Sequence, residues 1–197
     1  GALLCAERGW ALFPVREGGK TPIFEGWQDR ATSDPIQIRA WAQEFPTCNW
    51  GVYAGPSNLL VVDCDKKKAV DGEAAWLKLQ VEQEAISETF TVRTPSQGLH
   101  VYLEGKGPTT TGTLREGIDT RGAGGYVVAP GSQIEGIPYR IESSAPACAI
   151  PPWLGELLAG RKAKDKLDRP EDAEVAGSIE EGRRDHELTR WAGVLRG

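Results

Sequence analysis

Two aspartates at the end of an apolar run are the residues of this sequence best suited to chemistry. The run Leu59–Val62 is continuous and partly β-branched, as in a strand buried on both faces, and it leads directly into Asp63 and Asp65. Residues two apart on a strand point to the same face, so both carboxylates can reach one point while Cys64 faces the other side. Carboxylate oxygens are the ligands that Mg²⁺ prefers. The pair predicts a metal site, and the alternative is an acidic strand end that faces water.

A third carboxylate stands in a second polar motif, Gly117-Ile118-Asp119-Thr120-Arg121. Alternation along a strand would aim Asp119 to one side, with Arg121 on the same face. The guanidinium of Arg121 could then pair with Asp119 or bind a triphosphate oxygen in a bidentate manner. An ordinary surface ion pair is the alternative for these two residues.

Four further residues could bind phosphate. His100 opens a strand directly after a turn that contains Ser96 and Gly98, so its imidazole can face the same sheet surface as the carboxylates. The backbone N–H groups of such a turn can hold an anion. Lys20, in a Gly/Lys/Pro loop, is either a phosphate contact or a solvated lysine. A lone histidine is more often structural than functional, so these residues indicate a phosphate site only when they are considered together.

Periodicity and turn residues predict the elements that position these side chains. Helical spacing favours helices over 36–44, 72–83 and 152–158, the first capped by Asp34 and Pro35. The tryptophans before residue 160 are interpreted as packing residues and not as base-stacking platforms. Strands are predicted at 10–15, 50–54, 59–62, 89–94, 99–103, 117–121, 126–129 and 139–141, with 117–121 and 126–129 paired through the glycine-rich residues 122–125.

The domain is expected to comprise residues 1–160. Residues 161–177 alternate charges with small residues and have the composition of a linker. Residues 178–197 regain helical periodicity and are predicted to begin a truncated C-terminal helical module. The sequence lacks methionine, so we expect that residue 1 is not the natural start.

Composition narrows the class of protein. With 40% hydrophobic and 26% charged residues, the 197-residue chain can bury one good core. Its net charge of -5 does not give the basic footprint of a protein that grips a duplex along its length, so any contact with nucleic acid should be local. The 4 cysteines contain no C-x-x-C pair, so a zinc site is not expected. Without a signal peptide or a long apolar span, we expect a cytoplasmic protein with reduced thiols.

The ordered set of motifs resembles the bifunctional primase-polymerase domain of the archaeo-eukaryotic primase superfamily, which occurs in phages, plasmids and mobile elements. The resemblance covers nearly the whole chain. Two positions depart from the family pattern: Gln97, where a second glycine is usual, and Trp50, where a smaller aliphatic residue is usual. The motifs that carry the resemblance are Gly9–Pro14, Lys20–Pro22, Gly26-Trp27, Ala31–Pro35, Asn49–Val52, Leu60–Asp65, Thr94–Tyr102 and Gly117–Ser132.

The resemblance implies a fold and a set of site residues. The fold would be α/β (α+β), a mixed RNA-recognition-type sheet that carries the site, with an N-terminal αβ unit beside it to form a cleft. Asp63, Asp65 and Asp119 would hold the catalytic Mg²⁺ or Mn²⁺. His100 would contact the nucleotide phosphates, and we expect Ser96, Gly98, Arg121 and Lys20 to complete the nucleotide site.

The function implied is template-directed nucleotidyl transfer in DNA replication, as primer synthesis or DNA polymerisation. The expected partners are a single-stranded DNA template, an NTP or dNTP, and a fused C-terminal helical module and helicase, with no membrane. Two alternatives remain from the residues themselves. A metal-dependent nuclease or phosphodiesterase could use the same carboxylates, and a non-catalytic nucleic-acid-binding module could share the sheet.

Overall fold

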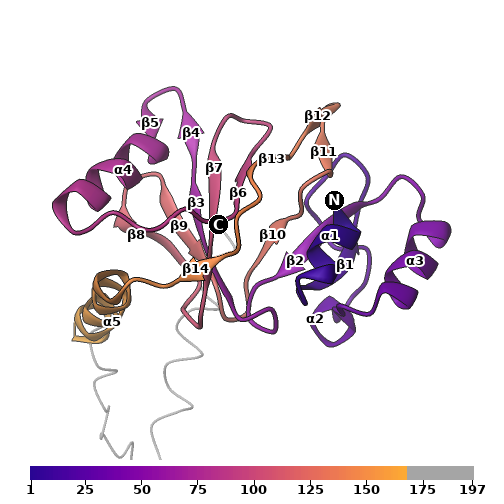
Figure 1. The fold of residues 1–197 in the computed structure, drawn as a ribbon, viewed down its shortest axis with the longest axis horizontal. Helices are drawn as coiled ribbons and strands as arrows, with labels where there is room; N and C mark the ends of the chain where they lie inside the picture. Colours follow the sequence, from indigo (N-terminus) through magenta and orange to yellow (C-terminus); the bar gives the residue numbers. More distant parts are fainter. Residues whose placement is uncertain (168–197) are drawn as a thin grey trace, which may run out of the picture. The chain divides into compact units, whose positions relative to one another are not determined.

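The computed structural model describes the backbone of residues 1–167 and the side chains of residues 1–160. Contacts divide the chain into units 1–163 and 164–197, and the sheets and the candidate site all lie in the first (Figure 1). The helices are α1 (Ala2–Glu7), α2 (Trp27–Arg30), α3 (Pro35–Glu44), α4 (Gly72–Glu82) and α5 (Pro152–Leu167). The strands are β1 (Ala11–Val15), β2 (Asn49–Tyr53), β3 (Leu59–Cys64), β4 (Lys66–Lys67), β5 (Val70–Asp71), β6 (Thr91–Arg93), β7 (Leu99–Glu104), β8 (Thr110–Arg115), β9 (Ile118–Arg121), β10 (Tyr126–Val128), β11 (Gln133–Ile134), β12 (Ile137–Pro138), β13 (Arg140–Ser143) and β14 (Cys148–Ala149).

Strand β3 lies at the centre of a seven-stranded sheet. The order is β13-β6-β7-β3-β9-β8, all antiparallel, and β14 adds to β7 in the parallel direction. The predicted buried central strand at 59–62 is therefore confirmed, because β3 is hydrogen-bonded on both edges and its apolar residues are fully buried.

The two faces of β3 are buried in different ways. Leu60, Val62 and Cys64 point to the back of the sheet, where they join a core with Trp76 of α4 and Leu154 of α5. Helix α4 packs on β3 and β9 from this side (Figure 1). Burial of these apolar groups explains why helices pack on this face.

The front face of β3 packs against a second, three-stranded sheet with the order β1-β2-β10. Val61 of β3 and Tyr102 of β7 share a core with Leu12 of β1, Val52 of β2 and Val127 of β10. Asp63 follows Val61 on this same face by the strand period of two. The apolar core therefore ends where the polar residues of the sequence begin.

Local sequence sets the helix starts. The Asp34 side chain accepts a hydrogen bond from the Ile36 backbone at 2.9 Å, and Pro35 occupies the first turn, as predicted. The Asp71 side chain caps α4 in the same way through the Ala74 N–H at 3.0 Å. Both caps agree with the helices expected from the sequence.

One predicted pairing is wrong. Strands β9 and β10 exist at the expected residues, but they belong to different sheets: β9 pairs with β3 and β8, and β10 pairs with β2. The glycine-rich link 122–125 runs between the sheets instead of turning back. Gly122 is buried against the Gly107 carbonyl, with no room for a Cβ. Sequence alternation identified both strands but not their partners, because pairing is set by contacts distant in the chain.

The general class agrees with the expectation, since the structure is a mixed α+β arrangement with mostly antiparallel sheets. Helix α5 runs to Leu167 and so continues through the first residues of the predicted linker. The rest of that linker and the predicted helical module at 178–197 lie outside the described residues. Several short elements were not predicted, namely α2, β4, β5, β8, β11, β12 and β14.

We predict that Gly72→Ala lowers the free energy of unfolding by at least ~2 kcal/mol, because a Cβ there would overlap the Gly117 carbonyl and the backbone of Asp65. Neither backbone can move without disturbing β3 or β9. Gly155→Ala is the matched control: it lies on α5 with open space around it, and alanine should raise helix stability by up to ~1 kcal/mol. Urea denaturation measures both, and equal effects would contradict the close packing.

Candidate functional site

Three polar side chains lie side by side across the centre of the large sheet. Asp63 of β3 is directly opposite His100 of β7 on one edge and Asp119 of β9 on the other. Residues opposite each other in antiparallel strands have Cβ atoms only ~5 Å apart and share a face. The structure thus brings together residues that are distant in the sequence, in the row His100–Asp63–Asp119.

Asp63 is a largely enclosed carboxylate at the middle of this row. Its Oδ1 lies 3.4 Å from Nε2 of His100 and its Oδ2 lies 3.8 Å from an Nη of Arg121, and its side chain is only 19% exposed. Burial by itself would raise the pKa of Asp63, but the contact with His100 and the charges of His100, Arg121 and Lys20 outweigh it and lower the pKa. Asp63 is therefore held as a carboxylate among cationic and donor groups.

His100 is directed at Asp63 through one ring nitrogen. The residue is 5% exposed, and its Nδ1 is buried with no hydrogen-bond partner among the described residues. The ring lies beside Tyr139, with centroids 5.7 Å apart. The remaining polar atom of the imidazole, Nε2, is the one available to Asp63 or to a ligand.

Asp119 and Arg121 form the ion pair that the sequence suggested. The Arg121 guanidinium donates to Oδ2 of Asp119 at 2.8 Å, and Oδ1 of Asp119 accepts the Gly112 backbone N–H at 2.8 Å. Arg121 also faces Asp63, so one guanidinium links both carboxylates. A single cation stands between two acids that would otherwise repel each other.

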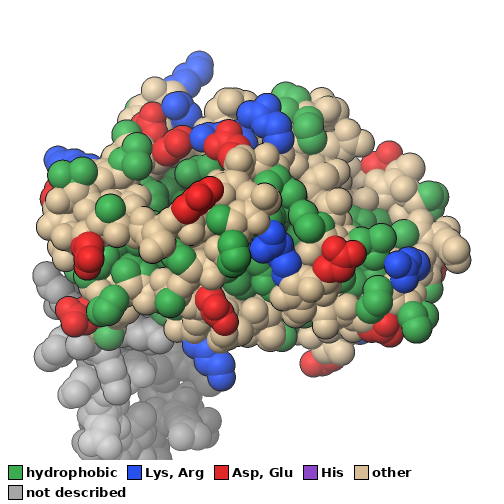
Figure 2. Space-filling view, in the orientation of Figure 1, with side chains coloured by type: hydrophobic (Ala, Val, Ile, Leu, Met, Phe, Trp, Pro, Cys, Tyr) green, Lys and Arg blue, Asp and Glu red, His purple; other side chains and the backbone are tan. Residues whose placement is uncertain are grey.

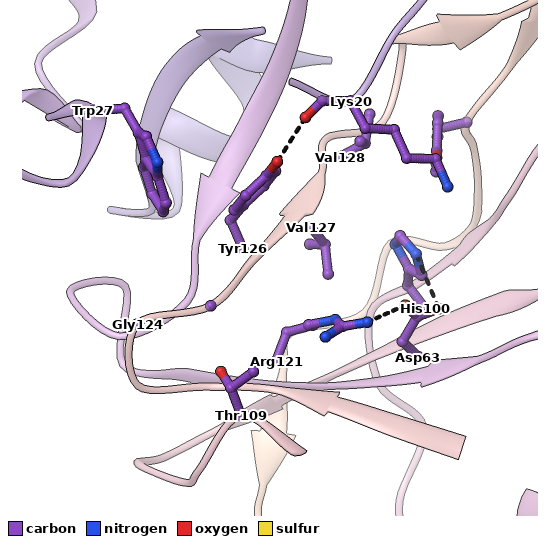
Figure 3. Close-up of a pocket in the computed structure, with 12 residues that line it drawn as sticks. Lys20, Trp27, Asp63, His100, Thr109, Arg121, Gly124, Tyr126, Val127 and Val128 are labelled. Atoms are coloured by element: carbon purple, nitrogen blue, oxygen red, sulfur yellow. Dashed lines mark hydrogen bonds and ion pairs between the residues drawn. The ribbon is translucent and has the colours of Figure 1, made fainter. Parts of the chain in front are cut away.

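An open cavity of about 370 Å³ lies over His100 and Asp63 of this row, a size suited to a small ligand (Figure 3). Asp63, His100 and Arg121 line it from the large sheet, and Lys20 lines it from the loop after β1. The other wall belongs to the small sheet and its α2. The remaining lining residues are Trp27, Thr109, Gly124, Gly125, Tyr126, Val127, Val128 and Tyr139.

Asp65 does not join the row. Its Oδ2 pairs with Nζ of Lys67 at 2.9 Å and its side chain is 39% exposed. Among the described residues, no group of three or more histidine, cysteine, aspartate or glutamate side chains is arranged so that it could hold a metal ion. Each of the three carboxylates predicted from the sequence is therefore paired with a basic side chain in this arrangement.

The predicted phosphate turn is a tight structure closed on itself. The Gln97 N–H donates to the Thr94 carbonyl at 3.0 Å, and the Gly98 N–H donates to Oγ1 of Thr94 at 2.9 Å. Ser96 is exposed and contacts Oγ1 of Thr94 at 3.1 Å. Neither Ser96 nor Gly98 lines the cavity, so the structure groups His100, Arg121 and Lys20 but leaves the turn apart from them.

The departure at Gln97 falls on a backbone position that favours glycine. Gln97 has φ +66°, a left-handed conformation that costs a residue with a side chain about 1 kcal/mol. Its carbonyl accepts a hydrogen bond from Arg93, which also pairs with Glu73 and Glu142. Gly98 is required for another reason, since a Cβ there would lie 2.5 Å from the Cys64 carbonyl.

Sequence reasoning missed the aromatic wall of the cavity. Trp27 was interpreted as a packing residue, and it does pack on Phe13 with ring centroids 4.2 Å apart, but it also lines the cavity with Tyr126. Tyr126 follows Arg121 through the glycine-rich link, and this short spacing was the one available sequence indication. Tyr126 reaches the cavity because β10 joins the small sheet, and the alternation pattern could not show that pairing.

The surface offers no broad basic face in the view of Figure 2, where acidic and basic side chains are interspersed. Within the described part of the chain, no helix is long and apolar enough to cross a membrane.

Comparison with known protein families assigns the class. The family model described as bifunctional DNA primase/polymerase, N-terminal, matches residues 2–153, which include every residue of the row and the cavity. The chain belongs to this family, as its motifs indicated, and the family is one of DNA primases and polymerases that act on DNA and nucleotides. No curated protein matches the chain.

We predict that the stability difference between the unmodified chain and Asp63→Asn depends on pH in one direction. The folded-state pKa of Asp63 lies below the ordinary 3.8, so the unfolded carboxyl binds more protons in the interval between the two values. The stabilising contribution is therefore complete above the ordinary pKa and is lost as pH falls through the folded-state pKa. Urea denaturation between about pH 2.5 and 6 measures it, and a difference that grows as pH falls would refute the assignment.

Proposed function

We propose that this chain catalyses template-directed nucleotidyl transfer by a divalent-metal mechanism. The observation that carries the proposal is the cavity lined by His100, Asp63, Arg121 and Lys20, with Asp119 beside Asp63 on the next strand. Acidic groups for a metal and basic groups for phosphates are thus combined at one place. That combination suits phosphoryl transfer, where charge develops on phosphate oxygens.

The donor chemistry of the site fits Mg²⁺ or Mn²⁺. Asp63, Asp65 and Asp119 are all carboxylates, the ligands of hard cations, and Asp63 and Asp119 lie opposite each other on adjacent strands. These three residues would hold the metal after Asp65 leaves Lys67 and Asp119 leaves Arg121. When bound, the metal would activate an attacking 3′-hydroxyl and offset charge on the leaving pyrophosphate.

The cationic side chains would change partners when a nucleotide binds. Arg121 neutralises Asp63 and Asp119 in the free chain, and its planar fork is equally suited to phosphate oxygens. His100 can turn its Nε2 donor from Asp63 to the triphosphate. Lys20 adds a point charge from the opposite wall of the cavity. The protein thereby orients the triphosphate, and no covalent intermediate is required.

Ser96 and Gly98 are proposed to contribute to the nucleotide site from the turn that follows Thr94. Ser96 is exposed in the turn between β6 and β7, where it would bind an outer phosphate or the template, and Gly98 lets the turn approach β3. Single-stranded DNA is the proposed template. Residues 1–160 are proposed as the catalytic domain, and a fused helical module and a helicase are its proposed partners.

We predict that Asp63→Asn and Asp65→Asn each reduce primer extension by at least ~100-fold, since even residues that only support metal ligands cost about 10- to 100-fold when replaced. Glu84→Gln is the control, because Glu84 is an exposed acid beyond α4. Extension of a labelled primer and the affinity for Mn²⁺ are measured for all three. Retained extension in either aspartate variant would remove that residue from the metal site.

The same assay separates the proposed reaction from its rivals. Labelled single-stranded DNA and a primed template are incubated with a metal, with and without nucleotides. Lengthening that requires triphosphates supports nucleotidyl transfer. Shortening without triphosphates identifies a nuclease, and binding without either change identifies a binding module.

We predict that Arg121→Lys raises the nucleotide KM about tenfold and leaves template affinity unchanged. Lysine keeps the charge but lacks the fork that can bind two oxygens at once. The structure places Arg121 on two carboxylates and beside the cavity, where such a fork matters. Steady-state extension kinetics and a DNA-binding titration measure the two quantities. Weaker template binding with an unaltered KM would show that Arg121 contacts the template and not the nucleotide.

A further inference from the structure

The loop that carries Lys20 is held by two side chains from other parts of the chain. The Tyr126 hydroxyl of β10 donates to the Lys20 carbonyl at 2.6 Å. The Asn49 amide of β2, which is 2% exposed, donates to the neighbouring Gly19 carbonyl at 2.9 Å. Two consecutive peptide units of an exposed loop are therefore fixed by separate hydrogen bonds.

Tyr126 is itself firmly placed. Its ring meets Phe13 and Trp27 edge to face, with centroid distances of 5.2 and 4.9 Å, and its backbone pairs with Tyr53 of β2. Burial raises the pKa of Tyr126 above its ordinary value, so the hydroxyl stays a donor at neutral pH. The tether to Lys20 thus starts from a rigid ring.

The same tyrosine is tied to Arg121 along the chain. Only the link 122–125 separates them, and this link is packed against residues 107–109. The Gly122 N–H donates to Oγ1 of Thr109 at 3.0 Å, and a Cβ on Gly125 would overlap that oxygen. The spacing from Arg121 in the large sheet to Tyr126 in the small sheet is therefore set by close packing.

Lys20 and Arg121 face the same cavity from opposite sheets. Both line it, and Figure 3 shows the Lys20 side chain extending over it toward His100. A lysine side chain loses much rotamer freedom when it binds, so a fixed backbone reduces the cost of ordering it. The lower cost strengthens the binding of an anion that contacts Lys20 and Arg121 together.

We propose that Tyr126 is a positioning residue whose hydroxyl sets the place of Lys20 relative to Arg121, so that the two cations bind one polyphosphate chain together. The inference relies on the proposed function only for one point, namely that the polyphosphate is the triphosphate of a nucleotide. Tyr126 acts through Lys20 and need not touch the ligand with its hydroxyl.

The test is a double-mutant cycle in the full chain, with Tyr126→Phe, Lys20→Ala and the combined variant. The affinities for a dNTP with Mg²⁺ and for inorganic tripolyphosphate are measured by calorimetry. Loss of one hydrogen bond should weaken binding of both ligands ~3- to 10-fold in Tyr126→Phe. In the Lys20→Ala background the same change should have no further effect, because the residue that Tyr126 positions is gone.

Tyr53→Phe is the matched control. It removes a hydroxyl from the neighbouring ring of the same aromatic cluster and leaves the bond between Tyr126 and Lys20 in place. We expect its affinity to equal that of the unmodified chain. In extension kinetics, Tyr126→Phe should raise the nucleotide KM and leave kcat unchanged.

Three results would overturn the inference: unchanged affinity in Tyr126→Phe, effects of Tyr126→Phe and Lys20→Ala that simply add, or a loss confined to kcat with a lowered unfolding temperature. The binding measurements need no polymerisation, so they separate two kinds of failure. If the predicted cycle is found in a chain that does not extend primers, the positioning role stands and nucleotidyl transfer fails. If primers are extended but the cycle is additive, only the positioning role fails.

Discussion

The site depends on one constraint, the in-register pairing of β3 with β7 on one edge and with β9 on the other. Antiparallel pairing places Asp63 opposite both His100 and Asp119, and a shift by one residue would move the polar groups into the apolar back face. The back face resists such a shift because Leu60, Val62 and Cys64 are buried there under α4 and α5. The hydrophobic core of one face thus fixes the register of the polar row on the other.

Nearby basic groups explain why the carboxylates of the row stay charged. Burial of Asp63 is unfavourable for a carboxylate, and the nearby donor and cationic groups more than compensate for it. Arg121 serves two carboxylates at once, and Lys67 serves Asp65. Under the proposed mechanism a metal would replace these cations at the carboxylates and leave Arg121 available to phosphate. In the free chain, therefore, the carboxylates proposed for the metal and the arginine proposed for phosphate are paired with each other, and binding of metal and nucleotide would separate them.

The small sheet provides the second wall of the cavity. Strand β10 carries Tyr126 across to β2, and the loop after β1 brings Lys20 over the same space. The glycine-rich link permits this crossing because its backbone lies against residues 107–109, where side chains would not fit. Glycine at positions 122 and 125 provides close approach rather than flexibility. The two sheets are consequently spaced by packing, and the residues on each can act on one ligand.

The sequence by itself determined the longer elements and the family. The apolar run before Asp63, the caps at Asp34 and Pro35, and the alternation around Asp119 each depend on neighbouring residues, so they could be interpreted without a structure. Motif order also identified the family. Only the tertiary structure decided that β9 and β10 separate, that Asp65 pairs with Lys67, and that Trp27 and Tyr126 wall the cavity with Lys20. These are contacts between residues distant in the chain or choices among competing partners, and local periodicity carries no information about which partner is within reach.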